Sequence, residues 1–191
     1  LGIVIDQLQL HLSAHLGVAM FPTDAQDGEA LFINAEAALK QSKSDKVKFS
    51  FYSPEINAKI VKKIETERQL KTAIHAKQFI LHYQPKVDLR SGKIIAAEAL
   101  IRWQHPQRNI VPPIEFIPLA EENGMILAIG EWVIRTVCAQ QAEWRRQAIP
   151  TVPIALNLSA LQFTGSHLHD ILNDSLSSNR LEPHWIELEL T

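Results

Sequence analysis

The amino-acid sequence predicts an α/β protein in which strands and helices alternate along most of the chain. After residue 78, short apolar runs typical of buried strands are separated by longer segments in which apolar residues recur with helical spacing. Before it, a charged amphipathic segment at residues 54–76 divides this region from a smaller first part. The alternation favours parallel β/α units, and the charged segment favours two structural units.

Composition and charge exclude several classes of protein. Of the 191 residues, 46% are hydrophobic and 21% are charged, which is ordinary for a globular chain. A net charge of -2 provides no basic field for a nucleic-acid polymer. The single cysteine, Cys138, cannot form an internal disulfide, and its apolar neighbours predict burial.

Targeting signals are absent from the sequence. No apolar run approaches the length of a membrane span, and no secretory signal is present. The chain opens at Leu1 rather than methionine, so we expect a cytoplasmic piece of a protein whose natural chain begins earlier. A membrane anchor in upstream segments stays open.

The first part alternates apolar and polar residues from 8 to 18, which predicts one half-buried strand. Helical spacing follows from Glu29 to Lys43, and Phe49 and Phe51 predict a short closing strand. Pro54 then begins the charged helix, with a proline at the first helical position. We interpret residues 54–76 as a helix linking two domains; a dimerising helix is the alternative.

The second part has a clear order of strands and helices. Apolar runs at 94–97 and 154–156 suit strands that are covered on both faces. Strands are predicted at 79–87, 94–101, 154–158 and 185–190, and helices at 114–122, 125–147 and 161–176.

Polar side chains interrupt three of these strands near their ends: Glu98, Asn157 and Glu189. The carboxyl ends of strands in a β/α barrel face one mouth, where active sites are built. Carboxylate and amide oxygens are hard ligands that suit magnesium, manganese or calcium. Each residue taken alone could be structural; their repetition in successive units favours a site.

Arg102 follows the second predicted strand, where its planar guanidinium could fork onto a phosphate. A surface arginine, salt-bridged to Glu115, is the alternative. Gln84 could read a base edge or complete its strand.

The histidines are left out of the site. His11 and His15 lie four apart on a predicted strand, which favours exposure to solvent over metal binding. His105 is expected in a loop, and His167 and His169 have no acidic cluster beside them.

Five ordered segments after residue 79 carry a resemblance to a known family. Residues 98–103, Glu-Ala-Leu-Ile-Arg-Trp, resemble the signature that names EAL domains. The other four agree in order and spacing: Tyr83-Gln84-Pro85-Lys86, Phe116-Ile117-Pro118-Leu119-Ala120-Glu121, Asn157-Leu158-Ser159 and Glu187-Leu188-Glu189-Leu190-Thr191.

Residues 8–52 resemble, more loosely, the end of a GGDEF domain, through the segments at 17–22 and 35–39. The family's usual residues are replaced at His15-Leu16, Lys40 and 44–47, so cyclase activity is not expected. The resulting division is a degenerate GGDEF-like tail at 1–53, a linker helix at 54–76 and the first half of an EAL domain at 77–191.

The resemblance implies a modified (β/α) TIM-type barrel that hydrolyses cyclic di-GMP to linear pGpG with two Mg²⁺ or Mn²⁺ ions. Glu98, the catalytic position, would bind metal together with Asn157 and Glu189. The residues implied to contact the substrate are Gln84, Leu100, Pro118 and, on a phosphate, Arg102.

A complete barrel takes about 250 residues, so the EAL-like segment holds roughly half of one. The family's remaining ligands would lie beyond Thr191, and we expect the fragment itself to be inactive. Two alternatives stay open for the parent protein: a non-catalytic cyclic di-GMP receptor, and a protein that acts chiefly through homodimerisation by its EAL domain or linker helix. Any sensor domain would lie upstream.

Overall fold

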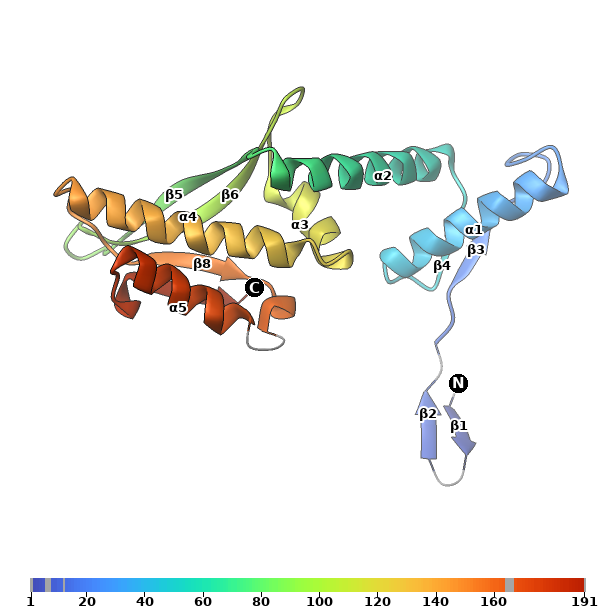
Figure 1. Ribbon diagram of the computed structural model, residues 1–191. Coiled ribbons are helices and arrows are strands. Elements are labelled where there is room, and N and C mark those ends of the chain that lie inside the picture. The colour runs from blue at the N-terminus through green and yellow to red at the C-terminus, as the bar shows by residue number, and fades with distance from the viewer. Residues whose placement is uncertain (1, 6–7, 12, 164–166, 191) are drawn as a thin grey trace. The chain divides into compact units, whose positions relative to one another are not determined.

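The computed structural model describes the backbone of residues 2–5 and 8–11, and residues 13–163 and 167–190 in full. The chain divides into two compact units, residues 1–65 and 66–191, each described below by itself (Figure 1). Within the described residues, no helix has the length and apolar character needed to cross a membrane.

The first unit contains two small sheets. Strands β1 (Gly2–Ile5) and β2 (Leu8–His11) form an antiparallel hairpin, whereas β3 (Leu16–Val18) pairs in parallel with β4 (Phe49–Phe51). The prediction of one strand over residues 8–18 was therefore wrong. Alternation continues through the segment, but β2 and β3 pair with different partners in different sheets.

Helix α1 (Gly28–Ser44) connects β3 to β4, close to the predicted bounds. Asp27 caps it by accepting a hydrogen bond from the N–H of Ala30 at 2.8 Å. Gly17 packs so tightly against α1 that an added Cβ would lie 2.1 Å from the carbonyl oxygen of Ala35. His15, predicted to be exposed, is half-buried, and its Nδ1 contacts the carbonyl oxygen of Val47 at 2.7 Å. The side chain of His11 lies outside the described residues.

Helix α2 (Pro54–His75) begins at the predicted proline and spans the boundary between the units. Ile56 is buried in the core of the first unit together with Ala37 and Ala38. Leu70 and Ala73, near the other end of the helix, are fully buried in the core of the second unit.

The second unit is built on one sheet. It contains β5 (Phe79–Val87), β6 (Ile94–His105), β7 (Asn109–Val111), β8 (Ile154–Leu158) and β9 (Ile186–Leu190). The order is β5-β6-β8-β9, with β7 paired to β6. Strands β6, β8 and β9 are parallel as predicted, but β5 and β6 are antiparallel. The turn from Asp88 to Lys93 is too short for a crossover between parallel strands.

Strand β6 is longer than predicted. It continues past residue 101 to His105, because the three residues of β7 pair with Trp103, Gln104 and His105. Arg102 and His105 therefore lie in the strand rather than in the loop where the sequence placed them. At the other end, Ile94 and Ile95 are exposed, contrary to prediction, because β8 pairs with β6 only from Ala97 onward.

Helices α3 (Pro113–Glu122), α4 (Ile126–Arg146) and α5 (His167–Asn179) pack with the sheet around one core (Figure 1). The helix predicted at 161–176 is divided into a 3₁₀ turn at Ala160–Phe163 and α5, with residues 164–166 outside the described part. A second 3₁₀ turn, Pro183–Trp185, precedes β9. Cys138 is fully buried, as predicted. The largest buried core side chains include Trp103, Phe116, Ile134 and Leu156.

Candidate functional site

The face of the sheet opposite the helices is polar. Side chains alternate between faces along a strand, so Glu98, Leu100 and Arg102 share one face of β6. Glu98 is paired in register with Gln84 on β5, and Asn157 on β8 with Glu189 on β9. The predicted residues thus come together, although Glu98 stands in the middle of β6 rather than at its end.

Glu98 and Asn157 are in direct contact. Nδ2 of Asn157 donates a hydrogen bond to Oε1 of Glu98 at 2.5 Å, between strands β8 and β6. This bond orients the amide so that its own oxygen stays free of Glu98, because the NH₂ group is the donor. A carboxylate and an amide oxygen are therefore held side by side.

Glu189 is bound by a cation of the protein. Nζ of Lys86, on β5, donates to Oε1 of Glu189, on β9, and the two charges form an ion pair. Three strand spacings separate β5 from β9, about 14 Å in a flat sheet. Side chains standing perpendicular to such a sheet would not meet, so the contact shows that the sheet curves around this face.

Lys86 lies in a strongly negative environment. The hydrogen bond from Glu189 raises the pKa of Lys86, and the charges of Glu189, Glu187 and Glu98 act in the same direction against a smaller effect of desolvation. The Lys86 and Glu189 side chains are 36% and 39% exposed, so water screens the pair. Lys86 is protonated here at neutral pH.

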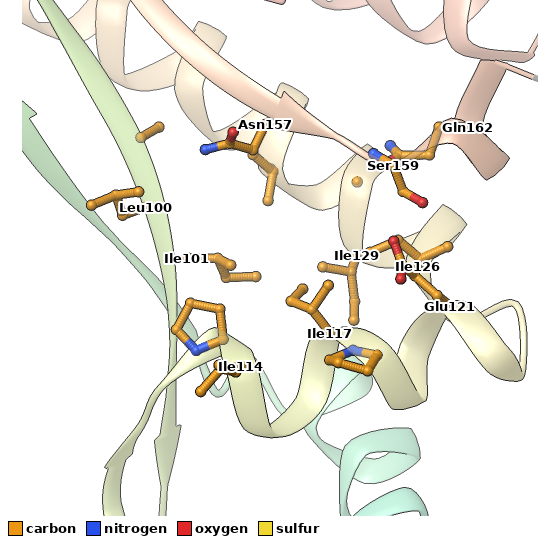
Figure 2. Close-up of a pocket in the computed structure, with 15 residues that line it drawn as sticks. Leu100, Ile101, Ile114, Ile117, Glu121, Ile126, Ile129, Asn157, Ser159 and Gln162 are labelled. Atoms are coloured by element: carbon orange, nitrogen blue, oxygen red, sulfur yellow. The ribbon is translucent and has the colours of Figure 1, made fainter. Parts of the chain in front are cut away.

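Leu100, Pro118 and Asn157 line one cavity of about 400 Å³ between β6, β8, α3 and α4 (Figure 2). Its wall is mainly apolar, and the side chains of Ile101, Ile117 and Ile129 project into it. Gln84 and Arg102 are not among its lining residues. Arg102 is half-buried, and its Nη1 donates to the carbonyl oxygen of Ile101 at 2.8 Å.

Sequence reasoning missed two contributors to this face. Lys86 stands two positions after Gln84, so strand alternation could have placed it beside the acids. Gln162, buried in the 3₁₀ turn after β8, accepts a hydrogen bond from the N–H of Ser159 through Oε1 at 3.0 Å. It fixes the chain just beyond Asn157, a role that no local pattern reveals.

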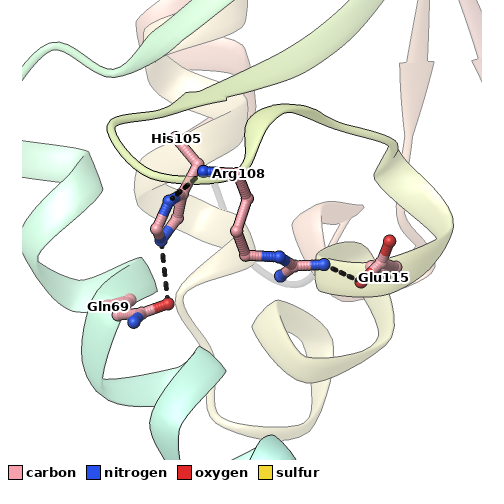
Figure 3. Close-up of polar contacts among 4 residues, drawn as sticks. All are labelled: Gln69, His105, Arg108 and Glu115. Atoms are coloured by element: carbon pink, nitrogen blue, oxygen red, sulfur yellow. Dashed lines mark hydrogen bonds and ion pairs between the residues drawn. The ribbon is translucent and has the colours of Figure 1, made fainter.

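His105 has a structural role. Its Nδ1 accepts hydrogen bonds from the N–H groups of Gln107 and Arg108, at 3.1 and 3.2 Å. The proton of the neutral ring is therefore on Nε2, which contacts Oε1 of Gln69 at 2.9 Å (Figure 3). Both ring nitrogens are used, which agrees with leaving His105 out of the site. Arg108, rather than Arg102, forms the observed ion pair with Glu115, at 2.5 Å.

The chemistry of Glu98, Asn157 and Glu189 fits a hard divalent cation. All three offer oxygen donors, and two of them are already in contact. Among the described residues, no three His, Cys, Asp or Glu side chains are grouped as a metal site, so an amide must complete any set built here. His167 and His169 are not part of such a group.

The curved sheet with helices on one face and acidic groups on the other defines an α/β protein of the TIM-type barrel class. Residues 67–191 match the EAL domain family. The chain belongs to this family.

Curated relatives extend the similarity over almost the whole chain. The bifunctional diguanylate cyclase/cyclic di-GMP phosphodiesterase MucR of Pseudomonas aeruginosa is 38% identical over 188 residues, covering 98% of this chain and 27% of the relative. The cyclic di-GMP phosphodiesterase PdeR of Escherichia coli is 34% identical, with 98% and 28% covered. The chain thus spans about a quarter of the length of these proteins.

Solved structures confirm the fold. The PaMucR phosphodiesterase in complex with c-di-GMP aligns with a TM-score of 0.62 and 42% identity, over 65% of this chain and 50% of that chain. The EAL enzyme Bd1971, with cAMP and cyclic-di-GMP bound, aligns with a TM-score of 0.64 and 26% identity, over 86% and 44%. The second unit thus has the fold of part of an EAL domain.

Proposed function

We propose that this chain is part of a cyclic di-GMP phosphodiesterase that hydrolyses cyclic di-GMP to linear pGpG. The observation that carries the proposal is the contact of Glu98 with Asn157, beside Glu189, on the polar face of an EAL-type sheet. The names of MucR and PdeR, which are phosphodiesterases of this dinucleotide, support the same substrate.

Glu98, Asn157 and Glu189 would hold Mg²⁺ or Mn²⁺, completed by residues beyond this chain. Such ions lower the pKa of bound water and neutralise the charge that develops on a phosphodiester during displacement. The protein's own part is to orient: Asn157 fixes the Glu98 carboxylate, and Lys86 fixes that of Glu189. Arg102 would bind a phosphate, while Gln84, Leu100 and Pro118 would contact the nucleotide.

The cavity beside Leu100 and Pro118 supports this substrate class. Its apolar walls and volume of about 400 Å³ suit a planar base, with the polar groups Asn157 and Ser159 on its rim. Arg102 would have to exchange its contact with the Ile101 carbonyl for a phosphate oxygen. Charge-assisted bonds to phosphate are stronger than bonds to a neutral carbonyl, which favours that exchange.

The deciding experiment is hydrolysis of cyclic di-GMP by the full natural protein with Mg²⁺ or Mn²⁺. We expect linear dinucleotide from wild type and a loss of at least about 100-fold for Glu98→Gln, because the variant removes a charged metal ligand. Glu182→Gln makes the same chemical change on an exposed side chain and should keep full activity. Binding without cleavage by the wild type would instead support the non-catalytic receptor.

The first unit is proposed as the end of a degenerate GGDEF-like domain (1–53), with residues 54–76 as the linker and 77–191 as EAL domain. The name of MucR, a bifunctional cyclase and phosphodiesterase that aligns over 98% of the chain, supports this. The close packing of Gly17 on α1 supports the matched segment at 17–22. A diguanylate cyclase assay on the full protein should detect no product from GTP; product formation would contradict degeneracy.

Homodimerisation and upstream sensor domains remain proposals for the parent. Val61 and Ile64 expose apolar surface on α2, which supports a helix that pairs with a second copy. Sedimentation at several concentrations should show a dimer that Val61→Lys disrupts, and a monomer at every concentration would exclude it.

A further inference from the structure

Lys86 places an ammonium group among the carboxylates proposed to bind metal. It is ion-paired with Glu189, 103 positions away in sequence, and Glu187 and Glu98 also act on its charge. Lys86 reaches Glu189 from β5, across the two strands that carry Glu98 and Asn157. The protein therefore supplies its own cation at the centre of the polar face.

An ammonium group and a divalent ion compete for the same oxygen atoms. A carboxylate oxygen that accepts a hydrogen bond from Lys86 uses lone pairs that a metal would need. Two cations held by one carboxylate also repel each other strongly at a few ångströms. Metal binding at Glu189 therefore requires Lys86 to withdraw.

Resting on the function proposed above, we propose that Lys86 is a built-in counter-ion that holds Glu189 in the metal-free protein and competes with the divalent cation for it. Lys86 is a positioning residue, because it contacts a metal ligand and not the substrate. It keeps the acidic face assembled before metal arrives and lowers the affinity of the loaded site.

The geometry suits an exchangeable partner. Lysine carries a compact charge on a flexible stem, and both side chains of the pair are more than one third exposed. Lys86 can therefore swing into water without leaving a buried charge. Because partly exposed ion pairs are weak, we expect its removal to tighten metal binding by about fivefold rather than by orders of magnitude.

The test is a titration of the full natural protein with Mn²⁺ alone, following the electron paramagnetic resonance signal of free Mn²⁺. Lys86→Met should lower the Kd for Mn²⁺ by about fivefold. Lys86→Arg keeps the positive charge and should bind Mn²⁺ like the wild type. Lys93→Met removes an equal charge from the exposed turn before β6 and serves as the matched control, with unchanged affinity.

Thermal unfolding provides a readout that a merely structural role would move the other way. Without metal, Lys86→Met should melt below the wild type, because the carboxylates lose their counter-ion. With saturating Mn²⁺ its Tm should rise by more than that of the wild type, because tighter binding adds more stability. A lysine with only a structural role would lower both the metal-free Tm and the Mn²⁺ affinity.

Glu98→Gln separates the two ways of failing. If the wild type binds Mn²⁺ and Glu98→Gln does not, the metal site stands; equal or weaker binding by Lys86→Met then overturns the role of Lys86 alone. If the wild type and all variants fail to bind Mn²⁺, the metal site is wrong and the role of Lys86 falls with it.

Discussion

Asn157 donates a hydrogen bond to Glu98 at 2.5 Å, joining two parallel strands across 59 positions of sequence. The bond fixes which end of the amide faces the carboxylate and so leaves the amide oxygen available to a cation. Second partners of this kind orient the atoms that bind a metal. The functional importance of Asn157 therefore extends beyond its own oxygen atom.

Replacing Asn157 by alanine removes both the oxygen donor and the orienting bond. We expect turnover of cyclic di-GMP by the full protein to fall by roughly 10- to 100-fold, with weaker Mn²⁺ binding. Because Asn157 is exposed on the sheet face, the fold should persist, which circular dichroism can verify. Wild-type Mn²⁺ affinity in Asn157→Ala would remove this residue from the metal site.

Arg102→Ala tests the phosphate assignment. Loss of one charge-assisted hydrogen bond should weaken cyclic di-GMP binding by about 1.5 to 3 kcal/mol, measured by calorimetry. Arg90→Ala, in the exposed turn between β5 and β6, is a control of the same chemistry and should bind normally. An unchanged binding curve for Arg102→Ala would show that its guanidinium does not contact the ligand.

Gly130→Ala should disturb the turn that follows Asn157. An added Cβ would lie 1.9 Å from Nε2 of Gln162, whose Oε1 holds the N–H of Ser159. Overpacking of this kind costs about 1–3 kcal/mol of unfolding free energy, measured by urea denaturation. Gly28→Ala places its Cβ in open space and should be nearly neutral. Equal stability of the two variants would mean that Gln162 can move aside freely.

Trp103→Ala should be the most destabilising of these changes. Its fully buried ring packs edge-on against Phe116, and its Nε1 donates to Oε1 of Gln78 at 3.1 Å. Truncating such a residue costs about 3–5 kcal/mol of unfolding free energy. Leu89 is 98% exposed, so Leu89→Ala should leave the urea midpoint unchanged. A small loss in Trp103→Ala would indicate that the core collapses into the space.

Burial raises the pKa of the Cys138 thiol to about 11, from an ordinary value of 9.0. Because the folded state keeps its proton more tightly, this thiol contributes stability below pH 9, and the contribution is lost as pH rises from about 9 to about 11. Cys138→Ala should lose this component of the stability profile.

Thiol reactivity checks the same property directly. At pH 8 a disulfide reagent should modify Cys138 only after unfolding in denaturant, because the folded thiol is buried and protonated. Rapid labelling of the native protein would contradict the burial of Cys138.

Several elements follow from the sequence because their periodicity is local. The strands at 79–87 and 154–158 have the predicted bounds, and α2 begins at Pro54 as expected. Alternation along β6 also places Glu98 and Arg102 on one face, whatever its partner strands are. Burial pattern and capping residues act within a few positions, so they can be read from the chain itself.

Pairing between distant segments was decided only by the tertiary structure. The division of residues 8–18 into β2 and β3, the extension of β6 to His105 and the antiparallel β5 all depend on the partner strand. The ion pair of Lys86 with Glu189 depends further on curvature of the whole sheet. The sequence by itself determined which side chains share a face; the curvature and pairing of the strands decided which of them touch, because those contacts join residues with no local relationship.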